Sequence, residues 1–185
     1  MNSSAYFPRK HPYRLGGGHV PGPAATPQYA QEAAAAASRA MENLTPASRR
    51  CLDAAQAQSR QLDDNHVGTE HIVLGVIATD REIAEALARA GVTEDLFRAQ
   101  LFDEPGPSPT GTIPLTARAR MILGLAQPAA AADRGEISPR HLMLGVIAES
   151  RDWLLRGFDG PHHLEEAATA AGTSLAEIES VLLHP

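Results

Sequence analysis

Histidine and cysteine are the side chains of this chain best suited to chemistry, because they bind metals and take part in proton transfer. His71 and His141 each precede an apolar run, His162 adjoins His163, and Cys51 is the single cysteine. The sequence contains neither H-E-x-x-H nor paired cysteines, and no serine, histidine and aspartate have the spacing of a nucleophile motif. We expect structural histidines, an inert thiol, no metal or other cofactor and no enzymatic activity; a histidine-based enzyme is the least favoured alternative.

The remaining motif and charge signals exclude several other functions. No G-x-x-x-x-G-K-[ST] phosphate loop is present, so we expect no ATP hydrolysis. The net charge is −6, and the cluster of Arg9, Lys10 and Arg14 is small, which argues against a nucleic-acid partner. There is no apolar run of about 18 residues and no secretory signal, and a lone cysteine suits a reducing compartment. These features favour a cytoplasmic protein without a membrane span.

The composition predicts an all-α protein. Hydrophobic residues make up 43% of the chain but aromatic residues only 4%, so alanine and aliphatic residues must fill the core. Alanine is the strongest helix former. Residues 1–28 are rich in proline and glycine and are expected to form a disordered tail. Residues 29–42 (YAQEAAAAASRAME) are a possible helical lead-in.

An internal repeat organises the rest of the sequence. The run LTPASR at residue 44 recurs as LTARAR at residue 115, and HIVLGVIA at residue 71 recurs as HLMLGVIA at residue 141, offsets of 71 and 70 residues. The sequence therefore predicts a domain over 43–185 with two pseudo-symmetric four-helix repeats, 43–103 and 113–185, separated by a linker at 104–112. The second repeat carries an insertion of 11 residues that contains Trp153 and Phe158.

Capping signals mark the ends of the expected helices. Thr45, followed by Pro46, and Thr116 are predicted N-caps of the first helix in each repeat. Gly75 and Gly145 fall within the second helices, where glycine costs about 1 kcal/mol relative to alanine. Because both repeats carry this glycine, we expect a close helix–helix contact there.

The first of these motifs resembles a known family. The residues Leu44-Thr45 together with Gly68-Thr69-Glu70-His71-Ile72-Val73-Leu74-Gly75 resemble the N-terminal repeat domain of Clp/Hsp100 unfoldases, in particular the ClpC branch. The resemblance covers about residues 41–185 and implies the all-α double-repeat fold. In full unfoldases this domain precedes ATPase modules. Because this sequence has no phosphate loop, we expect a stand-alone binding module that resembles only the N-terminal domain.

The resemblance also implies a possible phosphoarginine-type site at Thr45 and Glu70. A carboxylate can accept a guanidinium through two hydrogen bonds, and a hydroxyl at a helix N-terminus can hold phosphate. Both residues also have a purely structural interpretation, since Thr45 is a helix cap and an acid in the first turn complements the helix dipole. Asn43 and Arg140 depart from the family pattern, and Arg140 reverses the charge of the acidic position in the second repeat.

A peptide groove is the second binding feature that the resemblance implies. In relatives, the groove between the repeats receives cyclic peptides, and its positions correspond to Met41, Leu115 and Arg120. The expected partners are therefore clients, adaptors or peptide ligands of the Clp protease pathway, bound by an adaptor or by a decoy that sequesters ligands. The alternative is a regulator that binds the Clp unfoldase directly through the insertion at 150–161.

Overall fold

The computed structural model describes residues 27–101, 111–133, 135–151 and 162–184. Nine α-helices lie within these ranges, and extended pairing there is limited to isolated β-bridges. The all-α class is therefore confirmed for the part of the chain that the structure describes.

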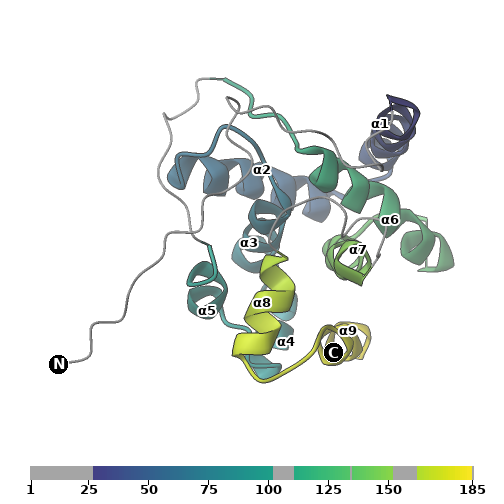
Figure 1. Cartoon of the computed structure of the whole chain (residues 1–185). Coiled ribbons are helices and arrows are strands. Elements are labelled where there is room, and N and C mark those ends of the chain that lie inside the picture. Colours follow the sequence, from purple (N-terminus) through teal and green to yellow (C-terminus); the bar gives the residue numbers. More distant parts are fainter. Residues whose placement is uncertain (1–26, 102–110, 134, 152–161, 185) are drawn as a thin grey trace.

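One leading helix and two groups of four helices follow one another along the chain (Figure 1). The leading helix is α1 (Pro27–Glu42). The first group comprises α2 (Pro46–Gln61), α3 (Thr69–Thr79), α4 (Arg81–Arg89) and α5 (Glu94–Arg98). The second group comprises α6 (Ala117–Asp133), α7 (Pro139–Arg151), α8 (His163–Ala170) and α9 (Leu175–Leu183). These groups confirm the two predicted four-helix repeats.

Three expected segments fall wholly or partly outside the described ranges. Of the tail expected at 1–28, only Pro27 and Gln28 are described, and they begin α1. Of the linker expected at 104–112, only residues 111 and 112 are described. Residues 152–161, with Trp153 and Phe158, also lie outside, so the disordered tail, the linker and the role of the insertion stay predictions.

Local hydrogen bonds and backbone conformation mark where the helices begin and end, and Thr45 is an N-cap as the sequence predicted. Thr45 caps α2 by accepting the Ser48 N–H at 3.1 Å, with Pro46 as the first helical residue. Gly91 and Gly172 directly follow the C-cap residues of α4 and α8 and adopt φ of 84° and 72°, in the left-handed region that glycine favours.

A glycine sets the closest approach in each of the helical hairpins α2–α3 and α6–α7. A Cβ atom on Gly75 would overlap the Cys51 carbonyl oxygen and lie 2.8 Å from the Ala55 nitrogen. A Cβ atom on Gly145 would lie 2.6 Å from the Ile122 carbonyl oxygen. Ile122 follows Cys51 by 71 residues, the repeat offset, so the two hairpins pack in equivalent ways.

Two short backbone crossings join the repeats. Leu44 forms a parallel bridge with Ile137, and Val67 forms one with Leu115. In each crossing, the segment that leads into the first helix of one repeat lies beside the segment that leads into the second helix of the other. The two repeats are therefore interlocked through their helix starts.

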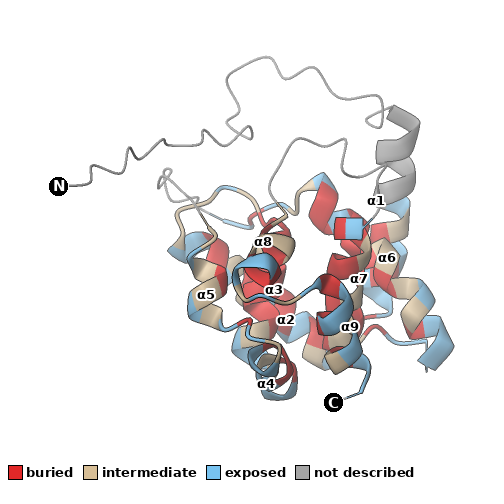
Figure 2. Cartoon of the chain, turned by 60° about the horizontal axis from the view of Figure 1, so that its bottom comes forward, coloured by how far each residue is buried: buried red, intermediate tan, exposed pale blue. Residues whose placement is uncertain are grey.

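Helix α3 is the centre of the core. It packs against α2, α4, α6, α7 and α8. Every residue from Thr69 to Val76 is buried except Glu70, which is half-buried. Figure 2 shows buried residues on the inward sides of the helices and exposed residues on their outer sides. Glu70 is thus a charged residue at the start of an otherwise buried helix.

Candidate binding site

The starts of α3 and α6 lie side by side and form the candidate site. The Val67 N–H donates to the Pro114 carbonyl at 2.8 Å, and the Thr116 N–H donates to the Val67 carbonyl at 2.9 Å. Both segments enter a helix two residues after their bridge, so two helix N-termini converge. Glu70 is the second residue of α3, and Thr116 caps α6 by accepting the Ala119 N–H at 3.0 Å. The acid comes from the first repeat and the hydroxyl from the second.

The carboxylate of Glu70 folds back over the start of α3. Thr69 Oγ1 donates to Glu70 Oε2 at 3.3 Å, and Glu70 Oε1 lies 3.0 Å from His71 Nδ1. A Cβ atom on Gly68 would overlap this carboxylate, so glycine makes room for it. Burial raises the pKa of Glu70, but the hydrogen bond and charge of His71, its own backbone N–H and the charge of His163 hold that pKa well below its usual range. Glu70 is therefore ionised at physiological pH.

His71 connects Glu70 to the loop before α3. Its Nε2 lies 3.1 Å from Asp64 Oδ2, and its ring is fully buried. Burial lowers the pKa of His71, but hydrogen bonds and charges from Asp64 and Glu70 outweigh it and raise that pKa to about 9. The Gly68 N–H also approaches Nδ1 at 2.9 Å, so the neutral ring accepts this N–H, whereas the protonated ring donates to Glu70. His71 thus orients the carboxylate of Glu70.

The second crossing has the same construction with the opposite charge. The Thr45 N–H donates to the Ile137 carbonyl at 3.0 Å, and the Ile137 N–H donates to the Asn43 carbonyl at 2.8 Å. Arg140 is the second residue of α7, in the place that Glu70 has in α3. Its Nη2 lies 3.5 Å from Glu82 Oε1, a loose ion pair at the surface. This crossing offers a cation where the first offers an anion.

Thr45 and Glu70, expected from the resemblance to form one site, lie at opposite ends of the α2–α3 hairpin. The hydroxyl of Ser59, near the end of α2, donates to the carbonyls of Asp64 and His66. These contacts hold the loop that leads to Glu70. At 1.5 Å per residue, the helix from Thr45 to Ser59 is about 20 Å long. The hydroxyl beside the Glu70 segment therefore belongs to Thr116.

The residues expected to line a peptide groove lie around the start of α6 and the end of α1. Leu115 is half-buried just before this helix, Arg120 is exposed in its early turns, and Met41 is 38% exposed in the last turn of α1. Helix α1 lies along α6, because a Cβ atom on Gly124 would come within 3.3 Å of the Ala36 Cβ. Gly124 lies one turn after Arg120 on the same side of α6, so α1 lies on the side where the groove was expected.

The second repeat contains a buried ion pair that the sequence motifs did not predict. Arg118 Nε and Nη2 donate to Glu149 Oε1 and Oε2 at 2.6 and 2.9 Å, and these two residues are 7% and 1% exposed. His162 Nδ1 lies 3.1 Å from Arg118 Nη2, so the cluster links α6, α7 and the start of α8. The available signal was that Arg118 and Glu149 lie within helices whose inward sides are mostly apolar. Its position in the interior indicates a structural role.

The other candidate chemical groups have partners within the fold. His141 Nδ1 accepts the Ser138 N–H at 3.1 Å, the position that His71 has in the first repeat. Cys51 Sγ lies 3.1 Å from Thr79 Oγ1, and burial raises the pKa of the thiol. Over the described ranges, no three histidine, cysteine or acidic residues are placed to hold a metal ion. In the same ranges, no helix has the length and apolar character needed to cross a membrane.

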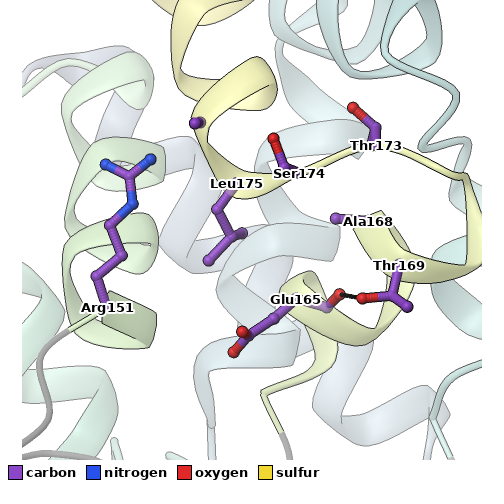
Figure 3. A pocket seen from close by; sticks show the side chains of 8 residues that line it. Arg151, Glu165, Ala168, Thr169, Thr173, Ser174 and Leu175 are labelled. Atoms are coloured by element: carbon purple, nitrogen blue, oxygen red, sulfur yellow. Dashed lines mark hydrogen bonds between the residues drawn. The ribbon is translucent and has the colours of Figure 1, made fainter.

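A pocket of about 310 Å³ lies between the end of α7 and helices α8 and α9 (Figure 3). Arg151 stands on one side, with Glu165 and Thr169 of α8 and Ser174 at the start of α9 on the other. Arg151 forms an ion pair with Glu179, the Thr169 hydroxyl donates to the Glu165 carbonyl, and Ser174 takes part in the capping box of α9. Since Arg151, Thr169 and Ser174 already have partners within the fold, we assign no ligand to the pocket.

Comparison with known proteins agrees with this architecture. The model of the Clp repeat (R) N-terminal domain matches residues 30–90 and 43–156. The chain belongs to this family. Two solved domains have the same fold. The N-terminal domain of the chaperone ClpD from Arabidopsis thaliana has a TM-score of 0.58 and 20% identity, and the match covers 77% of this chain and 96% of that chain. The Hsp104 N-terminal domain from Candida albicans has a TM-score of 0.56 and 15% identity, and the match covers 76% of this chain and 89% of that chain.

Curated relatives of this Clp repeat domain are much longer proteins. The ATP-dependent Clp protease ATP-binding subunits ClpC of Staphylococcus epidermidis (strain ATCC 12228 / FDA PCI 1200) and Staphylococcus aureus (strain USA300) are each 29% identical over 119 residues. The match covers 62% of this chain but 15% and 14% of those proteins. The resemblance to the ClpC branch is thus confirmed for the N-terminal repeat region.

Proposed function

We propose that this chain is a binding module of the Clp pathway that recognises a phosphorylated arginine side chain at the crossing of α3 and α6. The observation that supports this proposal is the convergence of two helix N-termini with Glu70 on one and Thr116 on the other. The module would serve as an adaptor that presents modified clients, or as a decoy that sequesters them.

The geometry suits both halves of such a ligand. The start of α6 carries the positive end of its helix dipole and the Thr116 hydroxyl, which together favour phosphate. Glu70 supplies the carboxylate for the guanidinium, and its lowered pKa keeps it charged. At the other crossing Arg140 repels a guanidinium, so one site per chain is expected.

Titration calorimetry with free phosphoarginine tests the assignment. The wild-type chain should bind one equivalent, and Glu70→Gln should weaken binding at least tenfold because it removes the charge of the guanidinium acceptor. Thr45→Val is the matched control, since it removes the hydroxyl at the other crossing and should leave the affinity unchanged. Binding that survives Glu70→Gln unchanged would refute the site.

A gain-of-function variant tests the same idea from the opposite direction. Arg140→Glu places an acid beside Thr45 and reproduces the arrangement of Glu70 and Thr116. The expected result is a rise in stoichiometry from one to about two phosphoarginines per chain. If stoichiometry stays at one while the fold is intact, the pairing of threonine and acid is not sufficient for binding.

A further inference from the structure

One nitrogen atom of His71 has two neighbours that it cannot satisfy at the same time. The Gly68 N–H lies 2.9 Å from Nδ1, and the carboxylate oxygen Glu70 Oε1 lies 3.0 Å from the same atom. An imidazole nitrogen accepts a hydrogen bond when it carries no proton and donates one when it is protonated. Nδ1 therefore binds the Gly68 N–H in the neutral ring and Glu70 in the protonated ring.

The other ring nitrogen, Nε2, is the better place for a permanent proton. It lies 3.1 Å from Asp64 Oδ2, and the ring is fully buried, so a proton on Nε2 stays beside a carboxylate. The proton that leaves His71 is thus the one on Nδ1. Its loss ends the contact with Glu70, and its return leaves the buried Gly68 N–H without this acceptor. Each state of the ring satisfies one neighbour and not the other.

Charged and titratable groups on the loop before α3 and on α8 surround this pair. Asp64 and His66 lie in the loop, and the His66 ring stands edge to face against the His71 ring with centroids 6.1 Å apart. On α8, the charge of His163 acts on Glu70. Burial lowers the pKa of His71, but Asp64 and Glu70 raise it to about 9, so Glu70 is paired with a cation at neutral pH.

The second repeat lacks this competition. His141 Nδ1 accepts the Ser138 N–H at 3.1 Å, but Arg140 has the place of Glu70. Among the described residues, the carboxylate near this ring is that of Asp133, which lies 3.9 Å from Nε2 rather than beside Nδ1. The choice between an N–H and a carboxylate therefore belongs to the crossing of α3 and α6.

We propose that His71 is a proton-dependent positioning residue for the binding site at Glu70. The protonated ring holds the carboxylate, whereas the neutral ring accepts the Gly68 N–H and leaves the carboxylate free for the guanidinium of a ligand. The ligand and the proton on Nδ1 compete for one carboxylate, so binding releases this proton. The inference rests on the proposed function, because its ligand is the phosphoarginine assigned to the same site.

Titration calorimetry of the full chain with phosphoarginine at pH 7, 8 and 9 measures this competition. The affinity should rise by at least about tenfold from pH 7 to pH 9, because fewer chains carry the competing proton as the pH approaches the pKa of His71. At pH 7, titrations in two buffers with different enthalpies of ionisation should show that close to one proton is released for each ligand bound.

His71→Gln is the control for both measurements. It has no ring proton, but it keeps His66 and His163, and the ligand is the same, so their own titration is present in both chains. This variant should release no proton from the site at pH 7, and its affinity should change by less than about twofold between pH 7 and pH 9.

Asp64→Asn provides a second route if His71→Gln does not fold. It keeps the ring but removes one of the carboxylates that raise its pKa, so the rise in affinity should move to lower pH. A nitrogen-15 NMR titration of the ligand-free wild type gives a readout that does not depend on binding. Nδ1 should lose its proton while Nε2 keeps it, and the Gly68 amide signal should shift at the same pH.

The outcomes separate this inference from the proposed function. Equal affinity at all three pH values in the wild type, or loss of the proton from Nε2 instead of Nδ1, overturns the role of His71 and leaves the binding site in place. Absence of phosphoarginine binding at every pH overturns the proposed function. The NMR titration then still decides whether His71 exchanges between Glu70 and the Gly68 N–H, and an unchanged Gly68 signal would exclude it.

Discussion

At the scale of single residues, Glu70 and Arg140 show how one position can change its chemistry within a kept scaffold. Each is the second residue of a helix that begins beside a threonine-capped helix. Glu70 is held by His71 at the start of α3, whereas Arg140 forms a loose pair with Glu82. The charge at this position therefore decides which crossing suits a cationic group.

His71 should make stability depend on pH. Its folded pKa of about 9 lies above its ordinary value of 6.5, so its contribution is complete below pH 6.5 and is lost as the pH rises through 9. The free energy of unfolding should fall over this range by up to about 3 kcal/mol. Urea unfolding of the wild type and of His71→Gln at several pH values measures the difference.

The control for that experiment is Asp64→Asn, which removes one of the two carboxylates that face the ring. It should move the loss of stability to lower pH without abolishing it. If the wild type and His71→Gln show parallel pH profiles, the two carboxylates do not keep His71 protonated.

At the scale of secondary-structure elements, close packing overrides intrinsic helix preference. Helix α3 accommodates Gly75 in its middle because the backbone of α2 lies against it, and α7 accommodates Gly145 against α6 in the same way. The leading helix α1 is held differently, because it packs on α6 through its own buried alanines. Hairpin contacts define the repeat unit, and α1 is an addition to it.

Gly75→Ala should therefore destabilise the protein. Helix propensity favours alanine by about 1 kcal/mol, but the added methyl meets the backbone of Cys51 and Ala55, and such overpacking costs about 1–3 kcal/mol or more. We expect a net loss of about 2 kcal/mol and a fall in Tm of roughly 5 °C. Thermal unfolding followed by circular dichroism measures it.

Ala57→Gly, on the exposed side of α2, is the matched control because it changes helix propensity without a packing contact. It should cost only about 1 kcal/mol. A higher Tm for Gly75→Ala than for the wild type would contradict the close approach of α2 and α3.

At the scale of the whole molecule, long-range contacts hold the helices in place. The two crossings join the repeats, and the Arg118–Glu149 pair links α6 to α7 inside the second repeat. A buried ion pair matters most through what its loss leaves behind, a charge without its counterion in the interior.

Glu149→Gln should consequently lower the free energy of unfolding by about 3–5 kcal/mol, since it removes the carboxylate that binds Arg118 through two hydrogen bonds. Chemical denaturation measures this loss. The matched control is Glu82→Gln, which breaks the exposed pair with Arg140 and should cost less than about 1 kcal/mol. Equal losses in the two variants would show that burial of the Arg118 pair has no energetic consequence.

The helices and their ends followed from the sequence because they depend on neighbouring residues. Thr45 and Thr116 cap helices through N–H groups three residues away, and Gly91 and Gly172 adopt left-handed backbone directly after helix ends. The recurrence of the motif that contains Gly75 and Gly145 predicted the two repeats. By itself, therefore, the sequence determined the all-α class, the repeat and the N-caps of the first helix in each repeat.

The tertiary structure decided which residues meet. Sequence matching within one repeat paired Thr45 with Glu70, but the crossing of Val67 with Leu115 brings Thr116 to the Glu70 segment instead. The attachment of α1 to α6 depends in the same way on contacts between residues far apart in the chain. Such contacts leave no periodic signal in the sequence, because they depend on how separate helices pack rather than on spacing along one helix.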